Sequence, residues 1–258
     1  GDVYKRQLQH RKVDVVSSAL DFILPFEKYK ITAGAKVSFT NTRNGINYDT
    51  SDPTLVQDDY FRYKEQIYAL YADYSREYSE RFSMQLGLRM EHTRTTGISE
   101  AKDTEDKHDY TRLFPTVYLL YSPTDGHALN FSFSNRISRP SQNMVNPFPF
   151  YQNKYTYACG REDLKPSYTY NAELGYTLKN NFNVSAYYSY SDDVFFQVVD
   201  LDAETNVTSF LWENFMQTHA FGLNNSYTFR TKWLQAYAQH GVSSVSYTHL
   251  RAHETDQY

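Results

Sequence analysis

Long segments in which apolar and polar residues alternate constrain the fold of this chain more than any other feature. In residues 81–96 one set of alternate positions is apolar and the other is polar. The apolar set is Phe82, Met84, Leu86, Leu88 and Met90, and the polar set is Ser83, Gln85, Gly87, Arg89 and Glu91. Successive side chains of a β-strand point to opposite faces. The pattern therefore predicts a strand with one apolar and one polar face.

The same alternation recurs along most of the chain and predicts an all-β protein of about ten long antiparallel strands. The predicted strands cover residues 12–24, 28–41, 60–75, 81–96, 108–122, 127–139, 166–178, 182–200, 206–230 and 233–244. Most exceed the roughly five or six residues of a typical globular strand. They supply the ~9–11 residues with which a tilted strand crosses a membrane.

The predicted connections fall into two classes that alternate along the chain. Short turns are predicted at 25–27, 77–80, 123–126, 180–181 and 231–232, and long polar loops at about 42–59, 97–107 and 140–165, with a shorter one near 201–205. Outer-membrane barrels have short periplasmic turns and long extracellular loops. We therefore expect an antiparallel transmembrane β-barrel fragment, with a soluble β-sandwich as the structural alternative.

Composition excludes several other classes of protein. The mean hydropathy is −0.68, and the longest apolar runs span only five residues, so no helix is expected to cross a membrane. The formal net charge of −4 argues against a nucleic-acid-binding protein. A single cysteine, Cys159, excludes a disulfide framework and a cysteine-based zinc site.

The cost of placing charge in lipid sets the expected orientation of the strands. An arginine on the lipid face costs about 2–4 kcal/mol at mid-membrane, so the apolar set should face lipid and the polar set a wet lumen. Arg89, Glu91 and Glu173 are accordingly predicted to face the lumen. Outer-membrane lipid is thus an expected partner, and aromatic residues near the strand ends fit headgroup depth.

Both ends of the chain differ from the rest. Residues 1–7 and 245–258 resemble translated sequencing-adapter remnants, and alternation is not evident in the second segment. We therefore divide the chain into a non-native end at 1–7, a partial barrel at 8–244 and a second non-native end at 245–258. On this interpretation residues 8–244 are an internal piece of a longer protein.

Several sequence motifs resemble the barrel of TonB-dependent outer-membrane receptors, in particular the Bacteroidetes-type outer-membrane β-barrel family. They are QLGLRME at 85–91, YTRLFP at 110–115, YLLYSP at 118–123, SNRISRP at 134–140, NPF at 146–148, LKPSY at 164–168, NAELGY at 171–176 and WEN at 212–214. The family usually has Gly-Asn-Pro before Leu164, whereas this chain has CGRED at 159–163. The resemblance covers most of residues 12–240.

The resemblance implies a transporter of the outer membrane rather than an enzyme. It implies energised uptake of a scarce nutrient such as a chelated metal, a glycan or a peptide. The expected partners are the TonB complex, which acts through a plug domain outside this sequence, and possible surface lipoproteins. No cofactor is expected. The functional alternatives are an outer-membrane barrel enzyme and a soluble β-sandwich adhesin.

Candidate ligand-binding residues lie at the end of one strand and in the loop that follows it. Arg136 and Arg139 could bind an anionic ligand, or they could pair with Glu91 or Glu173 on neighbouring strands. In loop 140–165, the candidates are Asn146, Phe148, Tyr151 and Tyr155. The aromatic side chains could stack on a ligand, or they could pack the loop onto the barrel wall.

Catalytic and metal sites have little support in the sequence. The carboxylates of Asp49, Asp52, Asp58 and Asp59 could hold a cation, but their spacing matches no calcium loop, so a solvated loop is favoured. The chain contains no His-Glu-x-x-His, Gly-x-Ser-x-Gly or phosphate-binding glycine loop. No catalytic residue and no metal ligand are therefore predicted.

Overall fold

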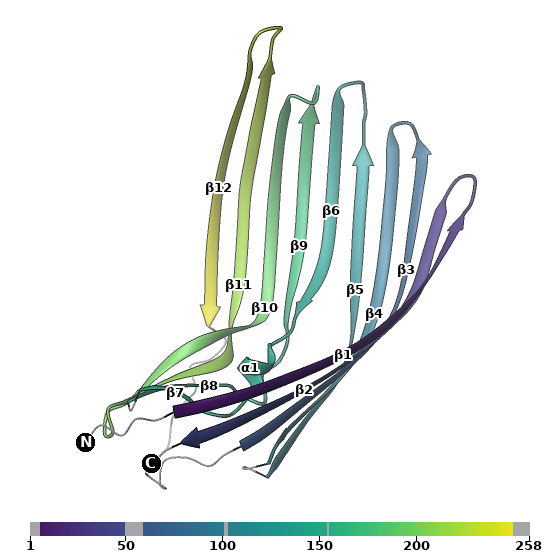
Figure 1. Cartoon of the computed structure of the whole chain (residues 1–258). Helices are drawn as coiled ribbons and strands as arrows, with labels where there is room; N and C mark the ends of the chain where they lie inside the picture. The colour runs from purple at the N-terminus through teal and green to yellow at the C-terminus, as the bar shows by residue number, and fades with distance from the viewer. Residues whose placement is uncertain (1–5, 50–58, 101–102, 154, 250–258) are drawn as a thin grey trace.

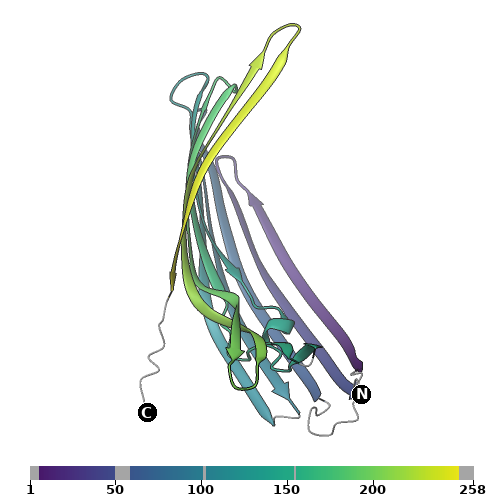
Figure 2. The same ribbon diagram turned by 90° about the vertical axis from the view of Figure 1, so that its left-hand side faces the viewer.

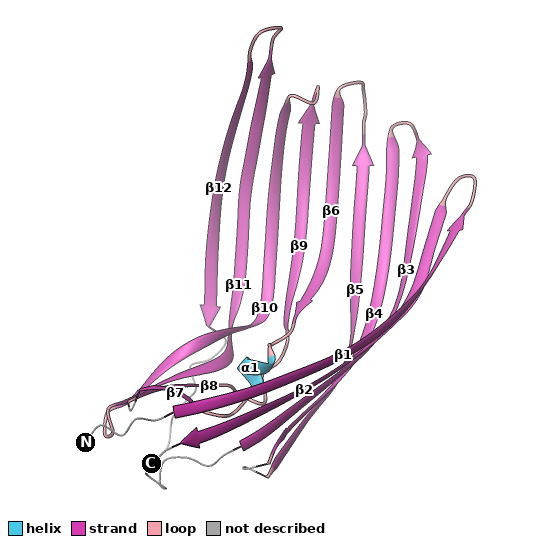
Figure 3. Ribbon diagram, viewed as in Figure 1, coloured by secondary structure: helices cyan, strands magenta, loops and turns pink. Residues whose placement is uncertain are grey.

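The protein forms a single strongly curved β-sheet in a computed structural model (Figure 1). The structure describes residues 6–49, 59–100, 103–153 and 155–249. The strands are β1 Arg6–Pro25, β2 Lys30–Asp49, β3 Asp59–Ser79, β4 Phe82–Ser99, β5 Thr104–Tyr121, β6 His127–Ser138, β7 Phe150–Asn153, β8 Thr156–Cys159, β9 Ser167–Leu178, β10 Phe182–Asp202, β11 Val207–Arg230 and β12 Gln235–His249. A short helix, α1, covers Gln142–Val145 (Figure 3).

The ten long strands follow one another as an antiparallel meander in the order β1-β2-β3-β4-β5-β6-β9-β10-β11-β12. β11 pairs with β12 along Met216–Arg230, and with β8 in parallel along Thr208–Leu211. Short turns join the strands at one end of the sheet, and α1, β7 and β8 lie at the other (Figure 1). Within the described ranges no helix has the length and apolarity to cross a membrane.

All ten long strands that the alternation predicts are confirmed, but the predicted loops are partly wrong. β10 reaches Asp202 in the predicted loop near 201–205, and the predicted loop 140–165 contains α1, β7 and β8. β2 and β3 extend into the predicted loop 42–59, and β4 and β5 extend into the predicted loop 97–107. Backbone pairing continues there although both faces have become polar, so alternation no longer marks the strand. The last strand likewise continues to His249, beyond the predicted end at residue 244.

The two faces of the sheet differ as the alternation predicts. Leu70, Met90 and Leu113 lie side by side on β3, β4 and β5 and are 57%, 41% and 54% exposed. Such rows of exposed apolar side chains are unusual for a water-soluble surface. The described strands also form one sheet rather than two facing ones (Figure 2), so the β-sandwich alternative is wrong.

The apolar band on the outer face ends before the strands do. Arg94 and Asp109 are on the same face as Met90, form an ion pair at 2.8 Å and are 60% and 55% exposed. A charged pair this open to its surroundings belongs outside the hydrocarbon. Phe39 of β2 and Tyr68 of β3, whose rings meet edge to face, mark this end of the apolar band. On the outer face, Phe39 is the second side chain after Ala35 and Tyr68 is the first after Leu70, counting away from the short turns.

The small hydrophobic core lies inside the curve of the sheet, at the end opposite the short turns. It consists of Phe61 from β3 with Val145 and Leu164 from the segment between β6 and β9. Phe195 of β10 and Trp212 of β11 pack against it from the other side. Since β3 is far from β10 and β11 in the sheet order, the segment bridges the concave side.

Candidate functional site

The candidate site is built around residues 139–166, which we call the inner loop. It follows the end of β6 at Ser138, precedes the start of β9 at Ser167, and folds against the concave face of the sheet (Figures 1 and 2). Helix α1 stops at Val145 because Pro147 favours an extended conformation at Asn146. β7 and β8 then form a hairpin whose second strand joins β11.

Arg139 fixes the start of the inner loop to the barrel wall. Its Nη2 donates hydrogen bonds to Glu91 Oε2 at 2.6 Å and to Thr93 Oγ1 at 3.2 Å. Glu91 also accepts a hydrogen bond from Arg89, and its side chain is only 8% exposed. One buried carboxylate therefore joins two guanidinium groups. Of the two roles that the sequence leaves open for Arg139, ligand binding and pairing with a carboxylate, this contact agrees with the second.

A second carboxylate lies near the same arginine. Glu65 Oε2 is 3.9 Å from Arg139 Nε. Glu65 pairs across the sheet with Thr95, next to Arg94 and thus beyond the apolar band. Burial raises the pKa of the Glu65 carboxyl, Arg139 opposes this shift, and Glu91 adds to it. Arg139 is thus held mainly by Glu91.

Arg136 is placed differently. It is exposed on β6, opposite Thr169 of β9 and on the same face as Glu173. With Tyr71, Arg89 and Phe114 it lines an open cavity of about 440 Å³ on the concave face. Of the two arginines that the sequence singles out, Arg136 is thus the one whose side chain is open to the lumen.

The predicted lumen-facing residues all lie on the concave face. Arg89 and Glu91 alternate with Leu88 and Met90 on β4, and Glu173 lines a separate cavity of about 250 Å³ with asparagine and serine side chains. The inner side of the sheet therefore carries polar side chains on β4, β9, β10 and β11.

Asn146 and the aromatic residues of the inner loop have mainly structural contacts. The buried Asn146 accepts hydrogen bonds from the backbone of Gly160 at 2.8 Å and of Phe148 at 3.2 Å. Phe148 lines a pocket of about 300 Å³ with Trp212, and the Tyr151 and Tyr157 rings are 5.5 Å apart. These contacts agree with the alternative in which the loop packs onto the barrel wall.

Tyr155 is the exception among these candidates. It lies in the turn between β7 and β8 and is 54% exposed. Its backbone N–H donates to Asn153 Oδ1 at 2.8 Å, and its carbonyl accepts from Thr208 N at 2.7 Å. The backbone of Tyr155 is therefore fixed while its side chain stays exposed.

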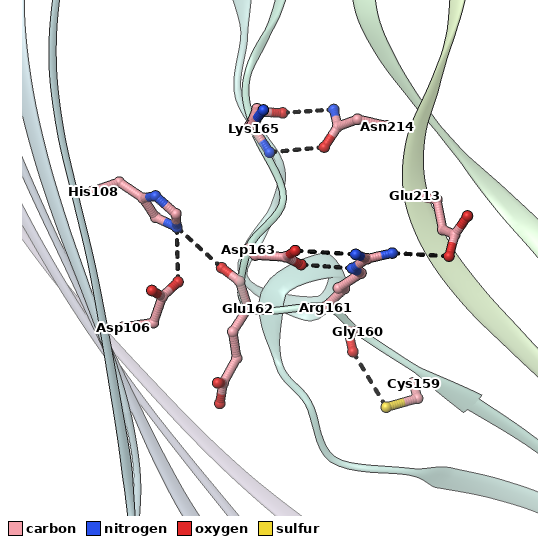
Figure 4. A network of polar contacts seen from close by, with 10 residues as sticks. All are labelled: Asp106, His108, Cys159, Gly160, Arg161, Glu162, Asp163, Lys165, Glu213 and Asn214. Atoms are coloured by element: carbon pink, nitrogen blue, oxygen red, sulfur yellow. Dashed lines mark hydrogen bonds and ion pairs between the residues drawn. The ribbon is translucent and has the colours of Figure 1, made fainter. Parts of the chain in front are cut away.

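The end of the inner loop is held by side chains that sequence reasoning missed (Figure 4). Arg161 binds Asp163 at 2.6 Å and Glu213 at 2.8 Å. Asn214 bonds both the N–H and the carbonyl of Lys165, at 2.8 and 3.0 Å, and also the carbonyl of Asp193. The side-chain amide of Asn214 thus links β11 to Lys165 and Asp193 through hydrogen bonds that the backbone of β11 does not make there.

Two motifs that resemble the receptor family meet at this point. The Leu164–Tyr168 segment lies against the Trp212–Asn214 segment of β11. The motif itself could have indicated the role of Asn214, which is the last residue of WEN at 212–214. Arg161 lies in segment 159–163, which departs from the family pattern. The resemblance therefore predicts no partner for its side chain.

A cavity of about 360 Å³ separates the inner loop from β5 and β10. Its wall carries Arg139, His108 and Asp193, together with Arg112, whose guanidinium lies 4.7 Å from the centre of the Tyr168 ring. His108 Nε2 contacts Asp106 Oδ2 at 2.7 Å (Figure 4). Burial, with neighbouring Asp192, raises the pKa of Asp193. The cavity is lined by both cationic and anionic groups.

No metal centre is evident in this region. Across the described ranges, no group of three or more His, Cys, Asp or Glu side chains is arranged to hold a metal ion. The cation site considered for Asp49, Asp52, Asp58 and Asp59 lies outside the part of the chain that the structure describes. Residues 50–58 are not described, and for Asp49 and Asp59 only the backbone is.

Comparison with known proteins identifies the family. The model of the outer membrane protein beta-barrel family matches residues 2–257. The chain belongs to this family. It is therefore a protein of the outer membrane, and its apolar face meets outer-membrane lipid. A comparison with curated protein sequences found no match.

Solved structures share the fold at low sequence identity. The copper transporter OprC gives a TM-score of 0.68 at 13% identity, over 93% of this chain and 39% of that one. The ferric enterobactin receptor PfeA from Pseudomonas aeruginosa gives 0.60 at 14%, over 90% and 35%. The ferric yersiniabactin uptake receptor FyuA from Yersinia pestis gives 0.57 at 17%, over 96% and 37%. The chain thus spans less than half the length of each.

Proposed function

We propose that the chain forms part of the barrel of a TonB-dependent receptor that takes up a scarce nutrient. The observation that carries the proposal is the inner loop, which is anchored to a polar concave wall while the opposite face is apolar. In a closed barrel a wall of this kind lines one side of a wet passage within lipid, and a loop folded against it narrows that passage. The copper and siderophore proteins with the same fold support this class.

In this proposal the residues of the lumen divide into two groups. Arg136 and Tyr155, which are exposed, contact the nutrient directly. Arg139, Asn146, Phe148 and Tyr151 shape the inner loop that surrounds it. A plug domain contributed from outside this sequence closes the barrel and couples it to TonB. Surface lipoproteins are further candidate partners.

Uptake in the bacterium tests the proposal. Cells that lack the gene are compared with wild type for accumulation of a ferric siderophore, a copper chelate, an oligosaccharide and a peptide. We expect one class to be lost, and the same loss when a protonophore collapses the proton gradient. Passage that survives the protonophore would indicate a passive pore and would contradict energised transport.

Substitution in the lumen separates ligand contact from loop anchoring. Arg136→Ala should weaken nutrient binding about tenfold or more without changing the position of the inner loop, because Arg136 is exposed. Asn130→Ala, in another part of the concave wall, is the matched control. If both substitutions leave binding unchanged, Arg136 is not a ligand contact.

The remaining alternative is a barrel enzyme. We infer that the chain is not one, and His108 provides the test because it is the histidine that lines the cavity beside the inner loop. Hydrolysis of lipid or peptide esters by the purified protein, lost on His108→Ala, would favour the enzyme. Absence of turnover together with nutrient uptake favours the receptor.

A further inference from the structure

We propose that the cavity between β5 and the inner loop binds a peptide in extended conformation, which adds a strand to β5. The segment of β5 that it pairs with is Glu105–Thr111, which we call the free edge. The inference rests on the proposed function and deepens it, since it names peptides as the nutrient class. It follows from backbone groups of β5 that the sheet leaves unpaired.

β5 is paired along its whole length on one side but only near one end on the other. Its ladder with β4 covers Thr104–Tyr121, whereas its ladder with β6 covers only Thr116–Tyr121. β6 then ends at Ser138 beside α1, while β5 continues along β4 (Figure 1). A gap therefore separates β5 from the inner loop at the end of the sheet opposite the short turns.

The direction of the hydrogen bonds identifies the unpaired groups. The N–H of Ser122 donates to the carbonyl of Arg81, so even-numbered residues of β5 direct their backbone groups to β4 and odd-numbered ones to the gap. The side chain of Asn135 accordingly donates to the carbonyl of Leu113, and Pro115, where pairing with β6 stops, has no N–H to offer. Within the described ranges, no backbone hydrogen bond forms on the gap side at Glu105, Lys107, Asp109 and Thr111.

The cavity of about 360 Å³ lies against this free edge. Lys107–Tyr110 of β5 and the end of the inner loop line it. Contacts across the gap close both of its ends. The carbonyl oxygen of Glu162 is 3.3 Å from His108 Nε2 (Figure 4), and the guanidinium of Arg112 lies 4.7 Å from the centre of the Tyr168 ring. The volume falls in the range of roughly 300–1,000 Å³ that is usual for ligand pockets.

The groups that lack partners here belong to the backbone rather than to side chains. Three charged side chains of the cavity already pair within the protein, Asp109 with Arg94 at 2.8 Å, Arg139 with Glu91 at 2.6 Å and His108 with Asp106 at 2.7 Å. The N–H and C=O groups of the free edge repeat about every 7 Å. An added strand presents acceptors and donors at the same repeat, whereas a metal chelate or a sugar does not. The chemistry that fits is therefore a polypeptide backbone.

The side chains of the free edge indicate which peptides fit. The exposed Arg94–Asp109 ion pair places the edge beyond the apolar band, where a peptide reaches it through water. Glu105, Lys107 and Asp109 are exposed, and charged side chains on an edge oppose pairing with apolar strands. We therefore choose as probe a soluble, fluorescently labelled hexapeptide of alternating alanine and threonine.

Fluorescence anisotropy measures binding of this hexapeptide to the purified outer-membrane protein that carries this sequence. Asp109→Pro removes an N–H that β4 does not use and should weaken binding about tenfold or more. Asp109→Ala loses the same carboxylate but keeps the N–H, so it should bind the peptide at least about fivefold more tightly than Asp109→Pro. Equal binding by the two variants, or no binding to the wild type, would overturn the proposal.

A second pair of variants covers the case in which Asp109→Pro does not fold, as judged by heat-modifiable migration on a gel. Lys107→Pro and Lys107→Ala make the same comparison one hydrogen-bonding position along the free edge. The same difference in peptide binding is expected between them, and equal binding would again overturn the proposal.

Two further probes distinguish an added strand from other ligands. A hexapeptide that is N-methylated at every amide cannot donate to β5 and should bind about tenfold more weakly. Millimolar maltohexaose should not displace the unmodified peptide. Equal binding of the methylated peptide, or displacement by the sugar, would refute the peptide site.

The uptake experiment separates this inference from the proposed function. Energised uptake of another nutrient class, without binding of the hexapeptide, would refute the peptide site and leave the receptor function intact. Peptide binding to a protein whose uptake survives the protonophore would have the opposite meaning, since the site would stand and energised transport would not.

Discussion

At the scale of single residues, Glu91 organises the site. Its carboxylate receives Arg89 from its own strand and Arg139 from the start of the inner loop. The sequence left two roles open for Arg139, ligand binding or pairing with a carboxylate. Alternation placed Glu91 on the lumen side, but only the curvature of the sheet brings residue 139 onto it.

Replacing Glu91 should release the inner loop. Glu91→Gln removes the carboxylate that Arg139 and Arg89 share, and we expect a loss of about 1–3 kcal/mol from the docking of the loop. Cleavage of the inner loop by trypsin, followed in detergent, measures the change. Glu65→Gln is the matched control, since it removes a carboxylate 3.9 Å from the same arginine and should change cleavage little.

Asn214 is predicted to matter as much as Glu91, at the other end of the loop. Asn214→Ala removes three hydrogen bonds to the backbone of Lys165 and Asp193, two of them exposed and one part-buried. Each such hydrogen bond contributes about 0.5–1.5 kcal/mol. Hydrogen exchange at Lys165 should accelerate. Asn225→Ala, on an exposed part of β11, should leave exchange unchanged, and an equal effect there would refute the role of Asn214.

At the scale of elements, the sequence predicts the membrane-crossing part well and the rest poorly. Within the apolar band one face meets lipid, so alternation marks every long strand. Beyond the band both faces are polar, and residues 42–49 therefore look like a loop although they pair as β2. β7 and β8 have only four residues each, too few for alternation to reveal. The contacts of Arg161 and Asn214 join segments about fifty residues apart, which no local pattern encodes.

A charge introduced on either face of β4 tests which of its faces meets lipid. Leu88→Arg puts a guanidinium on the apolar face and should cost about 2–4 kcal/mol of folding free energy in vesicles. Gln85→Arg puts the same group on the exposed concave face and should cost less than about 1 kcal/mol. Urea titration of the folded protein in vesicles measures both, and similar costs would contradict the facing of the strand.

At the scale of the whole molecule, the sheet is an open wall. Within the described residues, β1 pairs only with β2, and β12 pairs only with β11. Unpaired backbone groups are costly in lipid, so such edges need further strands. We expect the chain on its own to refold poorly in detergent, without heat-modifiable migration on a gel. A heat-modifiable band from the isolated chain would contradict this expectation.

The whole account depends on lipid contacting the convex side and water contacting the concave side. Spin labels placed singly along Phe82–Met90, with Cys159 replaced by serine, report this directly in membranes. Collision with oxygen should peak at positions 84, 86 and 88, and collision with a water-soluble nickel chelate should peak at 83, 85 and 89. If 84, 86 and 88 are shielded from both reagents while 89 reports bulk water, the row lies in a soluble core and the barrel interpretation is wrong.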